Sequence, residues 1–259
     1  LTIAGGVFNE VKDYTVTVKA TGYQDATVTQ TIEPGPELFV SEGKGNMVCV
    51  AGKKEHTVAV KNDGTVWAWG DGQSGRLGDG TTGRDNWRSV PGQVSNLTEI
   101  MAVAVGENHT LALKSDGTVW AWGSNSSGQL GDGSNMAKTV PVQVLSDSET
   151  GNALSGIQAI AVGVDHSLAL KSDGTVWAWG KNNYGQLGNG EKGFSAKSTI
   201  PVQVLTDLET KTALTDIQAI AAGNEHSLAL KSDGTVWAWG RNYYGQLGVG
   251  QDRSSLAES

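Results

Sequence analysis

The chain has 259 residues, a formal net charge of −8 and an unusual share of glycine (36) and tryptophan (9). The acidic balance argues against a nucleic-acid partner, because proteins that bind a phosphate backbone usually present a basic face. The single cysteine excludes a disulfide within the chain, and no apolar stretch is long enough to insert into a membrane as a helix.

Residues 1–32 differ in composition from the rest of the chain. The stretches 14–20 and 26–32 alternate threonine with valine around a turn at 21–25, which predicts the two strands of a hairpin. A two-stranded hairpin is marginally stable alone. The segment resembles the C-terminal hairpin of a bacterial immunoglobulin-like surface domain. This resemblance implies that the chain belongs to a larger surface or secreted protein.

Residues 33–45 are predicted to form a linker, because Pro34-Gly35-Pro36 breaks the strand pattern. Within it, residues 36–40 read Pro-Glu-Leu-Phe-Val and precede Gly52 at nearly the spacing with which Pro91 precedes Gly106. The segment 36–40 is therefore a candidate latching strand for a later repeat.

The remainder, 46–259, consists of tandem repeats. A run of ten residues, Lys-Ser-Asp-Gly-Thr-Val-Trp-Ala-Trp-Gly, stands at 114–123, 171–180 and 231–240, and with Asn62 in place of serine at 61–70. Such periodicity is typical of stacked or radially arranged units. The repeats are bounded as follows: 46–99, 100–156, 157–216 and 217–259.

Each repeat shows the pattern of four strands. An apolar strand ends in glycine, a second strand begins at histidine, a third reads Thr-Val-Trp-Ala-Trp, and a fourth opens with proline. The Asp-Gly pair between the second and third strands is a strong hairpin signal. In residues 118–122 the two tryptophans share one face while valine and alanine share the other, so both faces are expected to be covered by neighbouring sheets. The fold class is all-β, with propeller-type blades of four antiparallel strands.

A longer pattern carries a family resemblance. The spacing His-x-x-Ala-Leu-x-x-Asp-Gly-x-Val-x-x-Trp-Gly-x-Asn-x-x-Gly-Gln-Leu-Gly-x-Gly is complete at 109–133, 166–190 and 226–250. It resembles the repeat of the regulator of chromosome condensation family. The copy at 56–80 departs from the pattern, with valine, glycine and arginine where the others have leucine, asparagine and glutamine. The resemblance covers residues 36–250 and implies a β-propeller, for which seven blades are usual.

The sequence does not decide whether the blades close into a ring, because four repeats are visible and the last lacks its proline strand. Three arrangements compete: a small closed ring latched by residues 36–40, an open arc, and a ring completed by another chain. An open arc would expose two apolar blade faces and should self-associate through them.

The histidines and aspartates that recur in each repeat are candidates for a metal or catalytic set. Each histidine opens an apolar strand, where its ring can donate to a neighbouring backbone carbonyl, and each aspartate sits in a turn that Asp favours. We therefore expect structural roles, no metal, no cofactor and no enzyme activity. These residues are His56, His109, His166 and His226, and Asp63, Asp116, Asp173 and Asp233.

The loops after the Trp-Gly pair vary while the framework is constant. Loops on a rigid scaffold often carry function, and Tyr, Trp and Arg are enriched among the residues that dominate interface energies. The predicted partner-binding residues are Trp87, Arg88, Lys181, Tyr184, Arg241, Tyr243 and Tyr244.

These observations favour a non-catalytic protein–protein interaction module that binds an unidentified protein through its blade loops, at the surface of a bacterium or outside it. The alternative is a structural spacer or capping module, which the near-identity of the repeats favours. Within the resembled family, nucleotide exchange on a small GTPase and inhibition of a β-lactamase by a propeller face are known activities. Neither carries over here, because the loops that perform them have no match in this chain.

Overall fold

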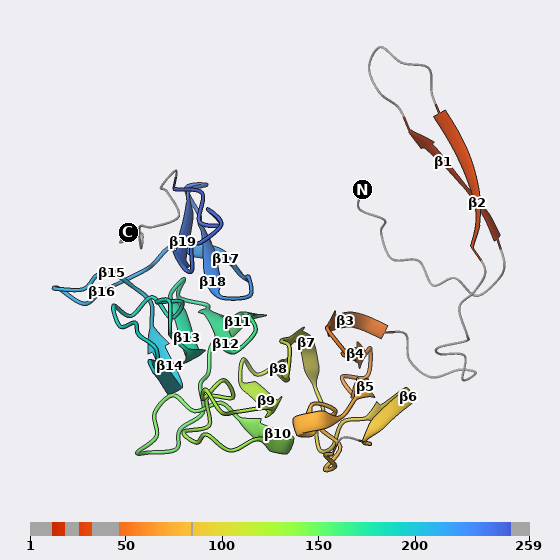
Figure 1. Cartoon of the computed structure of the whole chain (residues 1–259), viewed down its shortest axis with the longest axis horizontal. Helices are drawn as coiled ribbons and strands as arrows, with labels where there is room; N and C mark the ends of the chain where they lie inside the picture. Colours follow the sequence, from red (N-terminus) through yellow and green to blue (C-terminus); the bar gives the residue numbers. More distant parts are fainter. Residues whose placement is uncertain (1–11, 19–25, 33–46, 84, 250–259) are drawn as a thin grey trace. The chain divides into compact units, whose positions relative to one another are not determined.

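The computed structural model divides the chain into two compact units, 1–44 and 45–259, and each is described by itself. Figure 1 shows the whole chain. The residues whose structure is described are 12–18, 26–32, 47–83 and 85–249.

The described residues of the first unit form one antiparallel pair of strands. Strand β1 (Lys12–Val18) pairs with β2 (Ala26–Ile32), with Val16 opposite Val28. The pairing agrees with the hairpin that the threonine–valine alternation indicates, and membership of an immunoglobulin-like domain stays a prediction. The latching segment 36–40 lies outside the described residues.

The second unit is built from antiparallel sheets that follow one another in chain order (Figure 1). Three sheets have four strands each: β3 (Met47–Lys53), β4 (His56–Lys61), β5 (Val66–Asp71) and β6 (Trp87–Gln93); β7 (Ile100–Val105), β8 (His109–Lys114), β9 (Val119–Gly123) and β10 (Lys138–Gln143); β11 (Ile157–Val162), β12 (His166–Lys171), β13 (Val176–Lys181) and β14 (Lys197–Gln203). The all-β fold with four-stranded antiparallel blades is thereby confirmed.

The fourth sheet has three described strands, β17 (Ile217–Ala222), β18 (His226–Lys231) and β19 (Val236–Gly240). A small hairpin of β15 (Leu205–Asp207) and β16 (Thr212–Ala213) precedes it. The one helical element in the described ranges is the short 3-10 turn η1 (Gln73–Gly75). Among the described residues, therefore, no helix is long enough to span a bilayer.

The Asp-Gly turns close each hairpin as the sequence indicates. In the first repeat, Asp63 Oδ1 accepts hydrogen bonds from the backbone nitrogen and the hydroxyl of Thr65, at 2.9 and 2.6 Å. These bonds lower the pKa of Asp63, since they stabilise the carboxylate. Gly64 has φ 77°, and a Cβ there would lie 2.7 Å from the backbone nitrogen of Glu99. The turn therefore requires glycine both for its backbone angle and for the close approach of the segment that leads into the next repeat.

Each sheet presents two different apolar faces. The leucine face carries the Leu or Val pair of the second strand with Val and Ala of the third, and the tryptophan face carries both tryptophans with the second-strand alanine. In one core cluster, Leu111 and Val119 from the second sheet pack with Ala169 and Trp179 from the third. The same arrangement joins the first sheet to the second and the third to the fourth. The leucine face of each sheet thus packs on the tryptophan face of the next.

The burial expected for both faces holds for the two middle sheets and fails at the two ends. Val176 of the third sheet is fully buried, whereas its counterpart Val236 in the fourth is 66% exposed. On the tryptophan side, Val103 of the second sheet is 7% exposed and its counterpart Val50 in the first is 67% exposed. Val236 on the leucine face of the fourth sheet and Val50 on the tryptophan face of the first are therefore exposed, whereas their counterparts in the middle sheets are covered by a neighbouring sheet.

Candidate functional site

In each sheet, the loop that follows the third strand lies at the same end of the strands as the turn between the first and second strands, because neighbouring strands are antiparallel. Acidic residues in those turns meet basic residues in the loops. Lys181 Nζ lies 3.6 Å from Asp165 Oδ2, and Arg241 forms an ion pair with Glu225. The hydrogen bond that Arg241 donates to the Glu225 carboxylate raises the pKa of Arg241 above its ordinary value.

An aromatic cluster surrounds Arg241. Its guanidinium carbon lies 5.1 Å from the ring centre of Tyr184 and 5.7 Å from that of Tyr243, within the range of cation–π contact. Tyr243 and Tyr244 meet edge to face, with ring centres 4.8 Å apart. Tyr243 is 49% exposed and Tyr244 is 75% exposed. We call Tyr184, Arg241, Tyr243 and Tyr244 the aromatic rim.

The backbone beneath the aromatic rim is fixed by its own amide side chains. Gln186 Oε1 accepts a hydrogen bond from the Tyr184 backbone nitrogen at 2.9 Å, and Asn182 Oδ1 accepts one from the Leu187 nitrogen at 3.0 Å. The fourth repeat has the same pair of bonds, in which the backbone nitrogens of Tyr244 and Leu247 donate to the side-chain oxygens of Gln246 and Asn242. The tyrosines therefore project from a preorganised loop, which lowers the entropic cost of binding a partner.

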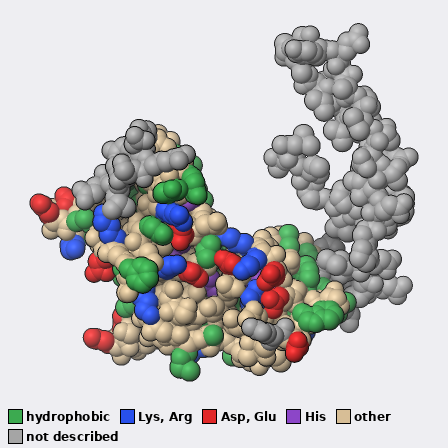
Figure 2. Space-filling view, in the orientation of Figure 1, with side chains coloured by type: hydrophobic (Ala, Val, Ile, Leu, Met, Phe, Trp, Pro, Cys, Tyr) green, Lys and Arg blue, Asp and Glu red, His purple; other side chains and the backbone are tan. Residues whose placement is uncertain are grey.

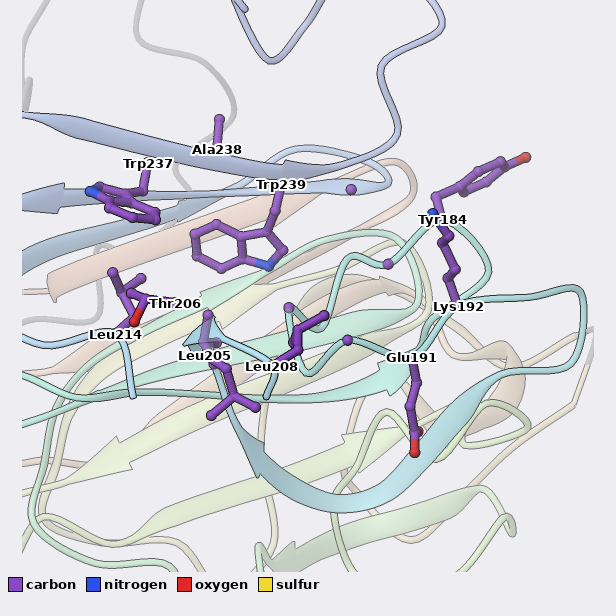
Figure 3. Close-up of a pocket in the computed structure, with 15 residues that line it drawn as sticks. Tyr184, Glu191, Lys192, Leu205, Thr206, Leu208, Leu214, Trp237, Ala238 and Trp239 are labelled. Carbon is purple, nitrogen blue, oxygen red and sulfur yellow. The ribbon is translucent and has the colours of Figure 1, made fainter. Parts of the chain in front are cut away.

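A cavity of about 330 Å³ opens beside Tyr184. Figure 3 shows Trp237 and Trp239 along one side of it and leucines along the other, with Tyr184 and Lys192 at one end. The leucines are Leu205, Leu208 and Leu214. Because its walls are mainly apolar and its mouth is polar, this cavity can accept an apolar side chain.

Of the residues that line the cavity, the sequence indicated Tyr184 and did not indicate the tryptophans and leucines, and it did not indicate Glu225. One signal was present, since the connection 205–216 is longer than its counterpart in the first repeat. The length did not reveal that Leu208 folds back onto Gly190, where a Cβ would lie 2.6 Å from the Leu208 side chain.

Trp87 and Arg88 are not joined to the aromatic rim by any contact between described residues. Trp87 opens β6 and is 67% exposed. Arg88 is held in place by an ion pair with Asp79 at 2.7 Å, and its guanidinium folds over Gly92, where a Cβ would lie 1.5 Å from Nη1. Their role in partner binding stays a prediction, and Arg88 has a structural role of its own.

Three of the repeat histidines, His56, His109 and His166, bridge neighbouring sheets. Nε2 of His109 lies 3.0 Å from Ser167 Oγ, and Nε2 of His166 lies 3.1 Å from Ser227 Oγ. The Ser167 hydroxyl donates in turn to the Gln129 carbonyl at 2.9 Å, so the histidine Nε2 carries the proton. For His56, His109 and His166 the partner of Nε2 is therefore a hydroxyl of the next sheet, and not the backbone carbonyl that was expected.

Burial keeps these rings neutral. Desolvation lowers the pKa of His109 and His166 to about 3, and lowers that of His56 to about 4. No group of three His, Cys, Asp or Glu side chains within the described ranges has an arrangement that could hold a metal. The geometry of these histidines is that of a contact between sheets.

The surface charge is mixed. In Figure 2, basic and acidic side chains are interspersed on the face in view, without a large area of one sign. On this face, therefore, the side chains do not form a basic patch, and the expectation that nucleic acid is not a partner stays a prediction.

Comparison with known proteins identifies relatives of the repeat region. A family model described as an RCC1-like domain matches residues 17–258. The ultraviolet-B receptor UVR8 of Arabidopsis thaliana is 34% identical over 174 residues, which cover 65% of this chain and 36% of the receptor. The probable E3 ubiquitin-protein ligase HERC6 of Homo sapiens is 37% identical over 163 residues, which cover 61% of this chain and 14% of the ligase.

A solved structure shows the same fold. Prp20p from Saccharomyces cerevisiae has a TM-score of 0.68 and 26% identity, and the match covers 83% of this chain and 50% of Prp20p. The chain therefore spans half of Prp20p and 36% or less of the two curated relatives.

Proposed function

Because the chain belongs to the RCC1-like domain family, we propose that it is a non-catalytic module that binds a protein partner through the aromatic rim. The observation that carries this proposal is the cluster of three tyrosines around Arg241 on preorganised loops, of which Tyr243 and Tyr244 are exposed. Tyrosine and arginine are enriched among interface hot spots, because they bury large areas and still satisfy polar groups.

The cavity beside Tyr184 gives this surface an anchoring point. An apolar side chain of the partner would enter between Trp239 and Leu208, while the tyrosine rings cover the surrounding backbone. Among the relatives, Prp20p is described by its binding properties to Gsp1p and histones. This supports protein binding as the function class and does not identify the partner of this chain.

The test is affinity capture with matched variants. The triple variant Tyr184→Ala, Tyr243→Ala and Tyr244→Ala should lose proteins that the parent chain captures from bacterial surface and host extracts. The control is Phe194→Ala, because Phe194 is 95% exposed and lies outside the aromatic rim, so its capture should match that of the parent chain. If the triple variant retains every captured protein, the structural spacer becomes the better description.

We also propose that the module is displayed outside a bacterial cell, on the resemblance of residues 1–32 to the end of an immunoglobulin-like surface domain. The relatives described above are eukaryotic proteins, so this proposal rests on that hairpin alone. Protease treatment of intact cells should remove the protein if it is displayed, and should leave it intact if it lies inside the cell.

A further inference from the structure

The loops that carry the aromatic rim differ in charge from the corresponding loops of the first two sheets. Residues 181–197 and 241–249 together contain four basic residues and one acidic residue, whereas 71–88 and 124–138 each contain as many acidic as basic residues. The chain as a whole has a net charge of −8, so the positive charge of these loops is a local feature. A partner that this charge attracts must be negative where it meets the loops.

The four basic residues differ in how far the fold already engages them. Lys181 and Arg241 are ion-paired with acidic residues of the neighbouring turns. Lys197 Nζ donates to the Ser126 carbonyl at 3.1 Å. Lys192 is exposed, and its ammonium forms no hydrogen bond or ion pair with any other residue that the structure describes. A carboxylate of a partner can therefore reach Lys192 without displacing a group of this chain.

Arg241 also keeps donors for a partner. Its Nη1 pairs with Glu225, and its other guanidinium nitrogens form no hydrogen bond to the described residues. The side chain is 33% exposed, and the rings of Tyr184 and Tyr243 lie within cation–π distance of the guanidinium. The N–H groups of a guanidinium form a planar fork, and a carboxylate fits this fork with both of its oxygens.

Lys192 lies beside the same tyrosine as Arg241. A Cβ on Gly185, the residue after Tyr184, would lie 3.8 Å from the Cβ of Lys192, and Figure 3 shows Tyr184 and Lys192 at the same end of the cavity. The polar groups around the tyrosine rings are thus a guanidinium, an ammonium and phenol hydroxyls, all of which can donate hydrogen bonds. A partner must supply acceptors for these donors, and the two positive charges favour carboxylates.

We propose that the partner of the aromatic rim is a protein segment rich in aspartate and glutamate. Its carboxylates bind Arg241 and Lys192, and its apolar side chains lie against the tyrosine rings. This inference rests on the proposed function and adds the chemistry of the partner to it. A single-stranded nucleic acid also combines negative charge with flat rings, but the net charge of −8 disfavours it.

The test selects binders to the full chain from a displayed library of random peptides of about twelve residues. The selected peptides should be enriched in aspartate and glutamate, and salt should weaken their binding. Arg241→Gln should lower their affinity about tenfold, because charged hydrogen bonds are lost, and Lys192→Gln about threefold. The matched control is Lys114→Gln, which removes the same charge at the opposite end of the strands, where Lys114 pairs with Glu99, and should leave the affinity unchanged.

Glu225→Gln separates binding of the partner from positioning of the rings. If a carboxylate of the partner binds Arg241, removal of the competing Glu225 carboxylate should leave the affinity equal or make it higher. Weaker binding in a variant that melts at the temperature of the parent chain would mean that the ion pair only orients the rings, and would overturn the proposal.

The tyrosine triple variant separates this proposal from the proposed function. Peptides that need the tyrosines but have no excess of acidic residues would overturn the acidic partner and leave the aromatic rim as a binding surface. A single-stranded oligothymidylate that binds the rim more tightly than the selected peptides would also overturn it. A selection without any peptide that needs the tyrosines would contradict the proposed function itself, and the acidic partner with it.

Discussion

The runs at 171–180 and 231–240 have identical sequences and different surroundings. In the third sheet, Val176 and Trp179 are fully buried, while Val236 is 66% exposed and Trp239 is half-buried beside the cavity. The local strand and turn structure is the same in both. The comparison shows that local sequence determines the hairpin, whereas the neighbouring sheet determines how much each side chain stabilises the fold.

The largest expected difference between the two runs is at the second tryptophan. Trp179→Ala should lower the free energy of unfolding by about 3–5 kcal/mol, because it opens a cavity in a fully packed core and removes the donor to Gln129. Trp239→Ala should cost clearly less, since solvent already reaches that ring. Urea denaturation of both variants measures the difference, and equal losses would contradict the view that the third sheet is the better packed.

Val176 and Val236 have side chains that form no hydrogen bonds, so substitutions at these two positions measure the effect of burial alone. Val176→Ala should cost about 2 kcal/mol, because the removed methyl groups are fully enclosed. Val236→Ala should change stability by less than about 0.5 kcal/mol in dilute solution. A cost at Val236 as large as that at Val176 would show that this face of the fourth sheet is covered.

The recurrence of the ten-residue run explains why the blades were predictable. Period-two alternation and the Asp-Gly turn are local signals, so the three hairpin strands of each repeat could be read from residues such as Val119 and Trp122. Burial could not, because Val176 and Val236 have the same neighbours in sequence. The residues of the aromatic rim could be predicted, because they vary between loops that are otherwise constant. The ion pair of Arg241 with Glu225 could not, because it depends on two loops that meet at the same end of the strands.

The histidines extend the comparison to pH. His109 has a pKa of about 3 in the folded chain against an ordinary value of 6.5, so the unfolded chain takes up the proton first as the pH falls. The neutral His109 ring therefore contributes to the free energy of unfolding above pH 6.5, and this contribution is lost as the pH falls from 6.5 toward 3. Each such ring adds up to about 1.4 kcal/mol per pH unit to the acid sensitivity in this range.

His109→Asn should therefore flatten the loss of stability between pH 6.5 and about pH 5, where few carboxylates titrate. His226→Asn is the matched control on the end sheet. The pKa of His226 is also lowered by partial burial, but the ring is half-exposed, so its removal should alter the pH profile less. Thermal unfolding at several pH values measures both, and identical profiles for the two variants would remove the distinction between middle and end sheets.

The smallest expected effect on stability is at the aromatic rim. Tyr244→Ala removes a ring that is 75% exposed and contacts Tyr243 at its edge, so the free energy of unfolding should change by less than about 0.5 kcal/mol. The same substitution should weaken capture of a protein partner, because exposed aromatic rings on fixed loops gain their contact energy only when a partner covers them. A Tyr244→Ala chain that is destabilised as strongly as Val176→Ala would place this tyrosine in the fold instead of the binding surface.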